Sequence, residues 1–584
     1  MKKNVLAVSI AAMIGGLGFA GLASAGSAFT NVGSGVTTDG TSAGATTFPV
    51  ADTLKLAPGG VGHILVVPYF STQDGNVSLL NIVNTDLVNG KAVKLRYRGA
   101  ANSDDVYDIT VLLSPGDVWS ANVSKVDGVS FLTTNDNSCT LPPVVNAPFS
   151  SGRANNDDGQ TLEGYIEILN MADVPKFLAT DETGLASDIA NPLYTAIKHV
   201  NGVAPCGTIP NQLADVTDPS IRAVPIVDAA TAASSLAANE WNGRGYNLPT
   251  GGLMANWTIV NLSKAGSFTG AATAIAAVDA AQDHLRAAAN IVFSPQDSTL
   301  QPANAGAVAN WTHPVFLTAD PLLVGGENED RSAIVQRVIP ASKYDFPDLS
   351  TPYVTNPQVM GNALLQAETL SQALATTSVS NEYLTSPDVG FATDWVFSAP
   401  ARRYNVAYNY AGTAAAKNRV LYAATLDYAA IPPVAALAGF QATYFTPDNT
   451  SISSLKPQVC VKPGALAYYD TEEQGAAGGV YVISPQPIGA ALAFCGEVSV
   501  LSFNGTSTLG AQIATQNITT KKSASVNYTD GWMSIATPGN ADAVNAGYTL
   551  GLPVIGHAYS KALGSSFNLG GIWAHRTDRA GIFQ

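Results

Sequence analysis

Five short runs of alternating apolar and polar residues between residues 61 and 124 restrict the fold of this chain more than any other feature. Turn-forming pairs separate the runs, including Asp74-Gly75, Asn89-Gly90 and Pro115-Gly116. Side chains alternate between the two faces of a strand, and such pairs favour tight reversals, so the segment predicts an antiparallel β-sandwich. The runs cover residues 63–69, 77–84, 91–98, 106–113 and 118–123.

The third run shows the alternation most clearly. Leu95 and Tyr97 should lie on one face of its strand, and Lys94 and Arg96 on the other. We therefore expect a mainly β protein built from antiparallel, Ig-like β-sandwich domains. Similar runs, each containing an aromatic residue, recur at residues 162–170, 255–261 and 531–535.

Helical signals gather in the middle of the chain. Asn356-Pro357 has the pattern of a helix start, and apolar residues at helical spacing follow it from Val359 to Ala375. The Ala-rich segments Asp228–Glu240 and Gly270–Ala289 also favour helix. These signals predict a helical, loop-rich insertion between two β regions.

The patterns divide the 584 residues into five parts. The segment after the signal peptide is rich in Gly, Ser and Thr. We expect it to be a flexible arm, because such a segment buries too little apolar surface to fold alone. The expected parts are a signal peptide at 1–25, the flexible arm at 26–50, an N-terminal β-sandwich region at 51–225, a mixed α/β insertion at 226–400 and a C-terminal β-rich domain at 401–584.

Residues 1–25 have the three parts of a secretory signal peptide. Lys2 and Lys3 give the positive start, Val5 to Ala20 form the apolar run, and Ala23-Ser24-Ala25 is a small-residue cleavage pattern. We therefore expect the protein to be exported and to reside outside the cell, at the cell surface.

The chain is acidic and contains few charged residues. Charged residues make up 12% of it, about half the ordinary share of roughly 25%. The net charge is −15, and removal of Lys2 and Lys3 with the signal would change it to −17. An acidic chain repels phosphates, so nucleic acid is not expected as a partner, whereas divalent cations are.

Four cysteines in an exported chain predict two disulfides. Proximity in the sequence favours Cys139 with Cys206 and Cys460 with Cys495, and two crossed pairings remain as alternatives. No C-x-x-C pair occurs, which argues against redox catalysis and against a zinc ribbon.

Three acidic loops contain candidate calcium ligands, because Ca²⁺ prefers carboxylate and carbonyl oxygens. None of the loops follows the EF-hand spacing, and Asn and Asp are also good turn formers, so a solvated turn is the alternative for each loop. The candidate metal ligands are Asp104, Asp105, Asp157, Asp158, Glu327, Glu329 and Asp330.

Catalytic signals are weak, and we do not expect an enzyme. The six histidines show no H-E-x-x-H or H-x-H spacing. Gly40 to Gly44 matches G-x-S-x-G, but it lies in the expected arm, without the preceding strand and following helix that a nucleophile elbow needs.

A resemblance to a known family comes from the segment 60–123. It contains GVGHILVVPYF, NIVNT, KAVKLRYRGAANSDDVYD and LSPGDVWSANV. This segment resembles a family of Gram-negative cell-surface proteins that includes surface-layer (S-layer) proteins, among them those that coat nanopod sheaths around outer-membrane vesicles. The later segments Gly164–Asn170, Met254–Asn261 and Trp573–Arg576 fit the same family. The resemblance implies lattice formation and supplies no active site.

We accordingly expect a secreted structural protein that self-assembles into an S-layer lattice on the outer membrane or on vesicle sheaths. Its main partner would be itself, with lipopolysaccharide or the outer-membrane surface as a further partner. No surface-layer-homology repeat, LPXTG-type signal or RTX repeat occurs, so attachment would be non-covalent. The alternatives are an adhesin or glycan-binding protein with exposed aromatic platforms and, second, an outer-membrane β-barrel.

Overall fold

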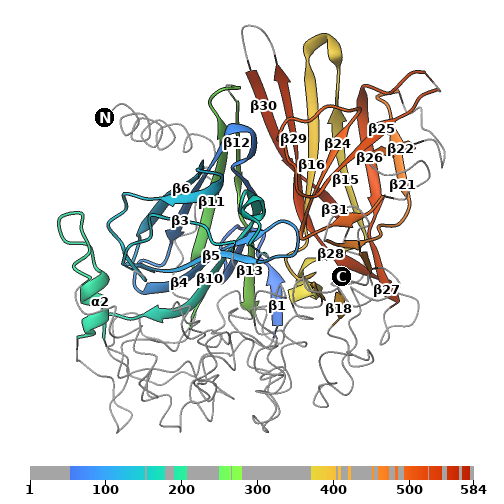
Figure 1. Cartoon of the computed structure of the whole chain (residues 1–584). Coiled ribbons are helices and arrows are strands. Elements are labelled where there is room, and N and C mark those ends of the chain that lie inside the picture. The colour runs from blue at the N-terminus through green and yellow to red at the C-terminus, as the bar shows by residue number, and fades with distance from the viewer. Residues whose placement is uncertain are drawn as a thin grey trace.

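The computed structural model shows two β-rich lobes side by side (Figure 1). Residues 53–278 supply the strands of the N-terminal lobe, and residues 375–578 supply those of the C-terminal lobe. The described residues are 53–177, 190–206, 249–278, 370–402 and 458–578, apart from short gaps within these ranges, together with short strands at 406–408, 419–421 and 450–452.

Two antiparallel sheets form the N-terminal lobe. In spatial order, the first contains β1 (Thr53–Leu56), β13 (Thr273–Val278), β2 (Ile64–Ser71), β10 (Glu163–Val174), β4 (Gly90–Gly99), β5 (Asp105–Leu113) and β8 (Cys139–Leu141). The second contains β12 (Gly266–Ala271), β11 (Leu253–Asn261), β3 (Asn76–Asn84), β6 (Val118–Val126), β7 (Val129–Thr133) and β9 (Ala147–Pro148). A short helix, α2 (Pro192–Ile197), and the 3-10 turns η1 (Gln73–Gly75) and η2 (Asp158–Thr161) accompany these sheets.

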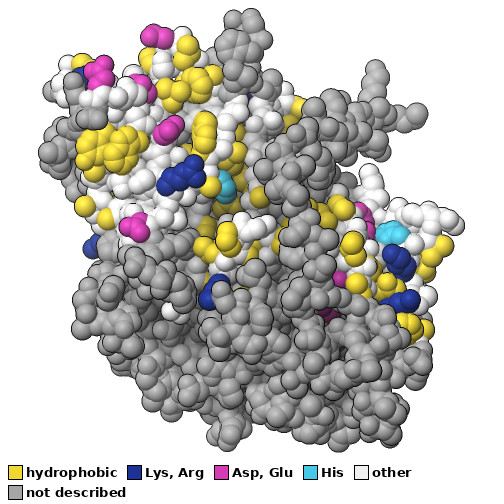
Figure 2. Space-filling view, turned by 180° about the vertical axis from the view of Figure 1, so that it is seen from behind, with side chains coloured by type: hydrophobic (Ala, Val, Ile, Leu, Met, Phe, Trp, Pro, Cys, Tyr) yellow, Lys and Arg dark blue, Asp and Glu magenta, His cyan; other side chains and the backbone are white. Residues whose placement is uncertain are grey.

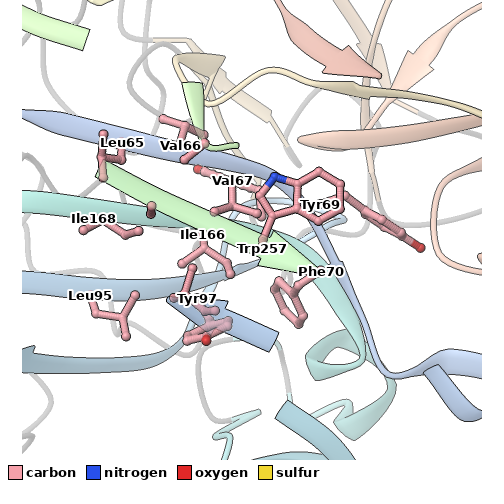
Figure 3. Close-up of a cluster of buried hydrophobic side chains, with 14 of the residues drawn as sticks. Leu65, Val66, Val67, Tyr69, Phe70, Leu95, Tyr97, Ile166, Ile168 and Trp257 are labelled. Carbon is pink, nitrogen blue, oxygen red and sulfur yellow. The ribbon is translucent and has the colours of Figure 1, made fainter. Parts of the chain in front are cut away.

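Side chains from the facing sides of the two sheets form the N-terminal core. Ile168 pairs with Leu65 on one neighbouring strand and with Leu95 on the other, so the three form an apolar row across the first sheet. Trp257 and its cross-strand partner Leu80 come from the second sheet. All five are buried, and Figure 3 shows how the labelled members lie. The alternation of the sequence thus gives each sheet one apolar inner face.

A bulge in β2 directs two adjacent aromatic residues to different parts of the molecule. Phe70 pairs with Gly164, whereas Val67 pairs with Ile166, so β2 has one residue more than β10 over this stretch. Pro68 lies within the bulge, where its missing N–H costs no ladder hydrogen bond. Phe70 lies beside Tyr97 in the core (Figure 3), with ring centroids 5.2 Å apart, and Tyr69 faces the C-terminal lobe.

The C-terminal lobe contains two larger sheets and three smaller ones. The six-stranded sheet is β22 (Tyr481–Ser484), β25 (Thr515–Thr520), β24 (Val498–Phe503), β16 (Phe391–Ser398), β29 (Ile555–Leu563) and β30 (Asn568–Ala574), with β24 and β25 parallel. The four-stranded sheet is β21 (Leu466–Tyr469), β26 (Asp530–Ala536), β15 (Ser378–Leu384) and β31 (Arg576–Asp578). The smaller sheets are β14 (Ala375–Thr376) with β28 (Thr549–Pro553) and β27 (Pro538–Ala541), β19 (Thr450–Ile452) with β20 (Val459–Val461) and β23 (Phe494–Cys495), and β17 (Val406–Tyr408) with β18 (Arg419–Leu421).

A second core lies between the two larger C-terminal sheets. Tyr383 stacks on Phe503, with ring centroids 5.0 Å apart, and Trp395 meets the same ring edge-on at 5.4 Å. Met533 and Ile535, from the four-stranded sheet, are fully buried in this cluster. The six-stranded sheet is therefore the inner layer of the lobe, and the four-stranded sheet is its outer layer.

The structure confirms a mainly β chain of antiparallel sheets, and it confirms all five strands expected between residues 61 and 124. The expected helix from Gly270 is wrong over residues 270–278, where β12 ends and β13 follows. The Ala-rich β13 pairs with β1 and β2 and is buried, so tertiary packing overrides its helical propensity. Two other helices were expected. Residues 370–374 of the helix expected over Val359–Ala375 are helical, and the helix expected over Asp228–Glu240 lies outside the described residues.

The strands near both ends of the expected 226–400 insertion belong to the two lobes. β11 to β13 complete the N-terminal sheets, and β14 to β16 join the C-terminal ones. These N-terminal sheets of seven and six strands are larger than the four- and three-stranded sheets of a constant-type Ig domain. The expected signal peptide and flexible arm lie outside the described residues.

Both disulfides form with the pairing that proximity favours. Cys139 in β8 bonds to Cys206, and Cys460 in β20 bonds to Cys495 in β23. The sequence separations are 67 and 35 residues. Loops of these lengths correspond to roughly 4 kcal/mol per bridge if the effect is loss of unfolded-state entropy.

A Gly164→Ala substitution tests the close approach of β10 to β4 at the position opposite Phe70. A Cβ atom at Gly164 would lie 1.7 Å from the Arg98 carbonyl oxygen, in the middle of the first sheet, so β4 and β10 would have to separate. We expect the free energy of unfolding to fall by about 3 kcal/mol or more in urea titrations. Gly59→Ala is the control, because a Cβ there meets nothing within 4 Å, and it should change the value by less than about 0.5 kcal/mol. Equal effects of the two substitutions would contradict this close approach of β4 and β10.

Candidate functional site

The first predicted acidic loop is part of a sheet edge. Asp104 is buried, and its carbonyl oxygen accepts a hydrogen bond from the Gly99 N–H at 2.9 Å. Asp105 begins β5, and its Oδ2 lies 3.7 Å from Nη1 of Arg98 on β4. These two carboxylates therefore lie beside a basic strand.

The second predicted acidic loop forms a turn cap. Asp157 Oδ1 accepts from the Gly159 N–H at 3.0 Å at the start of η2, and Asp158 Oδ1 accepts from the Ser151 hydroxyl at 2.6 Å. Both side chains thus stabilise the local chain. The third set, Glu327, Glu329 and Asp330, lies outside the described residues.

The structure does not gather metal ligands in the part of the chain that it describes. No group of three or more His, Cys, Asp or Glu side chains there could hold an ion. Calcium binding stays a prediction. His63 Nδ1 accepts from the Ala277 N–H, and His575 contacts Val396 O through Nε2 and the Asn381 amide through Nδ1. Burial lowers the pKa of His575 to about 3, so it is neutral.

The basic face of β4 is buried, which the alternation of the sequence did not predict. Lys94, Arg96 and Arg98 occupy alternate positions and are all fully buried, and Leu95 and Tyr97 face the core as predicted. Lys94 Nζ lies 2.9 Å from Asp108 on β5, and Arg98 Nε lies 3.3 Å from Glu167 on β10. Cross-strand carboxylates thus compensate the buried charge on both sides of β4. The carboxylate positions are Asp105, Asp108 and Glu167.

Lys91, at the start of the same strand, is the centre of a second buried cluster. Its Nζ lies 2.6 Å from Asp173, 3.2 Å from Asp86 and 2.9 Å from the Thr250 hydroxyl. All three ammonium hydrogens therefore have acceptors. The cluster connects β4 and β10 to the segment that leads into β11.

Aromatic rings fill the junction between the two lobes. The Tyr559 ring on β29 lies 5.3 Å from Phe268, 5.9 Å from Trp257 and 6.3 Å from Tyr69, measured between centroids. Tyr559 and Val396 belong to the same apolar cluster as the N-terminal core. One core therefore extends from the two sheets of the N-terminal lobe into the inner sheet of the C-terminal lobe.

Two buried carboxylates lie beside this aromatic contact. Glu163 on β10 accepts from the Gln512 N–H at 2.7 Å and from the Tyr69 hydroxyl at 3.4 Å. Asp394 on β16 pairs in register with Tyr559, and its Oδ2 accepts from the Ser507 hydroxyl and from the next two N–H groups at 2.7–2.8 Å. Both carboxylates thus hold the segment 507–512 against the junction.

That segment also bonds directly to the N-terminal lobe. The Asn76 side-chain amide donates to Leu509 O at 2.9 Å. On the other side of the junction, the N–H groups of Glu497 and Val498 both donate to Ala100 O, at 2.8 and 3.1 Å. The lobes are therefore joined by backbone hydrogen bonds as well as by apolar packing.

Burial sets the protonation of the junction. It raises the pKa of Asp394 to about 6, although its three hydrogen bonds oppose the shift. It also raises the pKa values of Tyr69 and Tyr559 well above the ordinary value, so both phenols stay protonated. No spacing in the sequence brings these residues together, because Gln512 and Glu163 are 349 positions apart.

The outer sheet of the C-terminal lobe carries a stacked aromatic pair in which Trp532 is exposed and Tyr469 is partly buried. Trp532 on β26 is 43% exposed and stacks on its cross-strand neighbour Tyr469 of β21. In Figure 2, hydrophobic side chains gather on the C-terminal lobe at the left of the view, with acidic and basic groups beside them. The sequence contains seven tryptophans, and alternation alone does not indicate which of them are exposed.

Comparison with known proteins gives no relative. No family model, curated protein or solved structure matches this chain. Among the described residues, no helix combines the length and apolar character needed to cross a membrane.

An Asp394→Asn substitution tests the buried junction carboxylate. Because the pKa of Asp394 is about 6 in the folded chain and near 3.8 when unfolded, the folded state binds this proton more tightly. The wild type should lose about 2 kcal/mol of stability from this group as the pH rises from 4 to 7. Asn keeps an oxygen for the three donors and does not titrate. We therefore expect the stability difference, variant minus wild type, to rise with pH by that amount.

Chemical denaturation of both proteins at several pH values measures this difference, in which other titrating groups cancel. Asp388→Asn, at an exposed position of the 3-10 turn η8 (Pro387–Val389), is the matched Asp-to-Asn control and should change the free energy of unfolding by less than about 0.5 kcal/mol. Parallel stability curves for Asp394→Asn and the wild type would contradict the assignment.

Proposed function

We propose that this protein is an exported structural protein that assembles with copies of itself into a layer at the cell surface. The observation that carries the proposal is the shared core of the two lobes. A lattice needs a building block of fixed shape, and a continuous apolar core with buried hydrogen bonds across the junction favours one.

Sheet edges at the ends of this block support the proposal. β8 and β9 end the two N-terminal sheets, and β21 and β22 end the two larger C-terminal sheets, as far as the described strands extend. Edge strands offer backbone N–H and C=O groups to another chain. Edges at both ends of one block are therefore suited to contacts between copies.

The covalent features agree with an extracellular location. Two disulfides with all four cysteines bonded are typical of oxidising compartments. Residues 1–25 carry the pattern of a secretory signal. The resemblance of segment 60–123 to S-layer proteins of Gram-negative bacteria points to the same function.

Imaging of the purified, disulfide-intact protein tests the proposal. We expect negative-stain electron microscopy to show ordered sheets or tubes at micromolar concentration in calcium-containing buffer. Protein that stays monomeric by light scattering under all tested calcium and salt conditions would contradict self-assembly.

Calcium dependence is a separate part of the proposal, because copies with a net charge near −15 repel one another. We expect excess EDTA to dissolve the lattice into protomers and added calcium to restore it. Sheets that persist in EDTA without bound metal would rule out calcium and leave apolar and edge-strand contacts as the cause of assembly.

A further inference from the structure

The outer face of the four-stranded C-terminal sheet, hereafter the outer face, has an unusual composition. Its inner side is apolar and buried, with Tyr468, Met533 and Val379 in the core. Side chains at the alternate positions point outward. The outer face consists of Tyr469, Trp532 and Glu382 in one cross-strand row, and Ser534, Ser380 and Arg576 in the next.

Trp532 presents one free aromatic face. Its ring centroid lies 4.8 Å from that of Tyr469, with an angle of 20° between the planes. Two rings of this size can be so close and nearly parallel only if they overlap face to face. Tyr469, on the β21 side, therefore covers one face of the indole, and the exposed face is turned toward Glu382 on β15.

Polar groups line the sheet in front of that free face. Glu382 and Arg576 are both exposed, and neither forms an ion pair within the described residues. In the cross-strand row that contains Arg576, the Ser380 and Ser534 hydroxyls are 3.0 Å apart. The outer face thus offers a carboxylate acceptor, a guanidinium donor and two hydroxyls within two strand spacings of about 4.8 Å each.

We propose that the outer face binds a pyranose ring of a cell-surface polysaccharide. A pyranose has one side of C–H groups, which pack against the electron-rich face of an indole, and a rim of hydroxyls that donate to carboxylates and accept from guanidinium groups. The arrangement of Trp532, Glu382 and Arg576 matches both properties. An apolar protein surface would leave Glu382 and Arg576 desolvated without partners, so a sugar fits this face better.

The rigid support of the site favours this role. The β26 backbone is paired on both sides, with β21 and β15, so Trp532 is held by a central strand. Tyr469 further restricts the indole orientation. A preorganised aromatic ring loses little conformational entropy when a ligand binds.

Sugar binding by the outer face does not depend on the proposed function. The claim that the sugar belongs to a polysaccharide of the producing cell does rest on the proposed function. A surface-layer protein needs a non-covalent attachment, and a polysaccharide that projects from the outer membrane would supply it. We therefore expect the ligand to be the polysaccharide part of lipopolysaccharide, and we do not expect its lipid part to bind.

Calorimetric titration of the purified full-length protein tests the proposal. The probe is the polysaccharide released by mild acid from the lipopolysaccharide of the producing cells, and the separated lipid A is the second arm. We expect the polysaccharide to bind and lipid A not to bind. Trp532→Ala should weaken binding at least about tenfold, because the stacking surface is lost. Trp532→Phe should retain most of the affinity.

Trp573→Ala is the matched control. Trp573 is 45% exposed, close to the value for Trp532, but it lies on β30 at the edge of the other sheet and pairs with Ala558. Its removal should change the affinity less than about twofold. Circular dichroism and the melting temperature of each variant show whether it folds, which an exposed position should permit.

The outcomes separate this inference from the proposed function. Wild-type protein that forms a lattice but binds no polysaccharide overturns the sugar site and leaves self-assembly intact. Sugar binding by protein that never assembles overturns the lattice and leaves the site. Equal losses in Trp532→Ala and Trp573→Ala, or lost assembly with unchanged sugar binding in Trp532→Ala, would also overturn the site. The last result would make the outer face a contact between copies.

Discussion

The apolar contact around Tyr559 is the interaction on which the rest of the structure depends. Tyr559 lies on the inner sheet of the C-terminal lobe and touches rings from three strands of the N-terminal lobe. The bulge at Pro68 makes this possible, because it turns Tyr69 toward the junction while Phe70 stays in the core. Two lobes that could have been separate domains therefore share one core, and the outer C-terminal sheet is held at a fixed place on a single block.

Buried charge has two different roles in this block. On β4, cations and carboxylates of neighbouring strands compensate one another, which offsets the cost of removing these charges from water. At the junction, Asp394 and Glu163 accept hydrogen bonds from one loop and hold it against the N-terminal lobe.

Local alternation predicted the β architecture well, because a strand with one buried face must repeat every two residues. The five N-terminal strands and the faces of Leu95 and Lys94 follow from it. The Ala-rich run in β13 could not be predicted in this way, since its neighbours β1 and β2 decide its conformation. The candidate sites could be predicted from the sequence even less well than the strands. Asp394 and Tyr559 meet only through the fold, and the sequence could place Trp532 opposite Met533 but could not show which of them faces outward.

Unfolding of the whole chain tests most directly the claim that the two lobes form one body. Differential scanning calorimetry of the disulfide-intact protein should give a single transition for both lobes, with a van't Hoff enthalpy equal to the calorimetric enthalpy. The shared core requires this result, because neither lobe can unfold without exposing the junction residues of the other. Two separate transitions, with one lobe melting while the other keeps its near-ultraviolet circular dichroism, would contradict it.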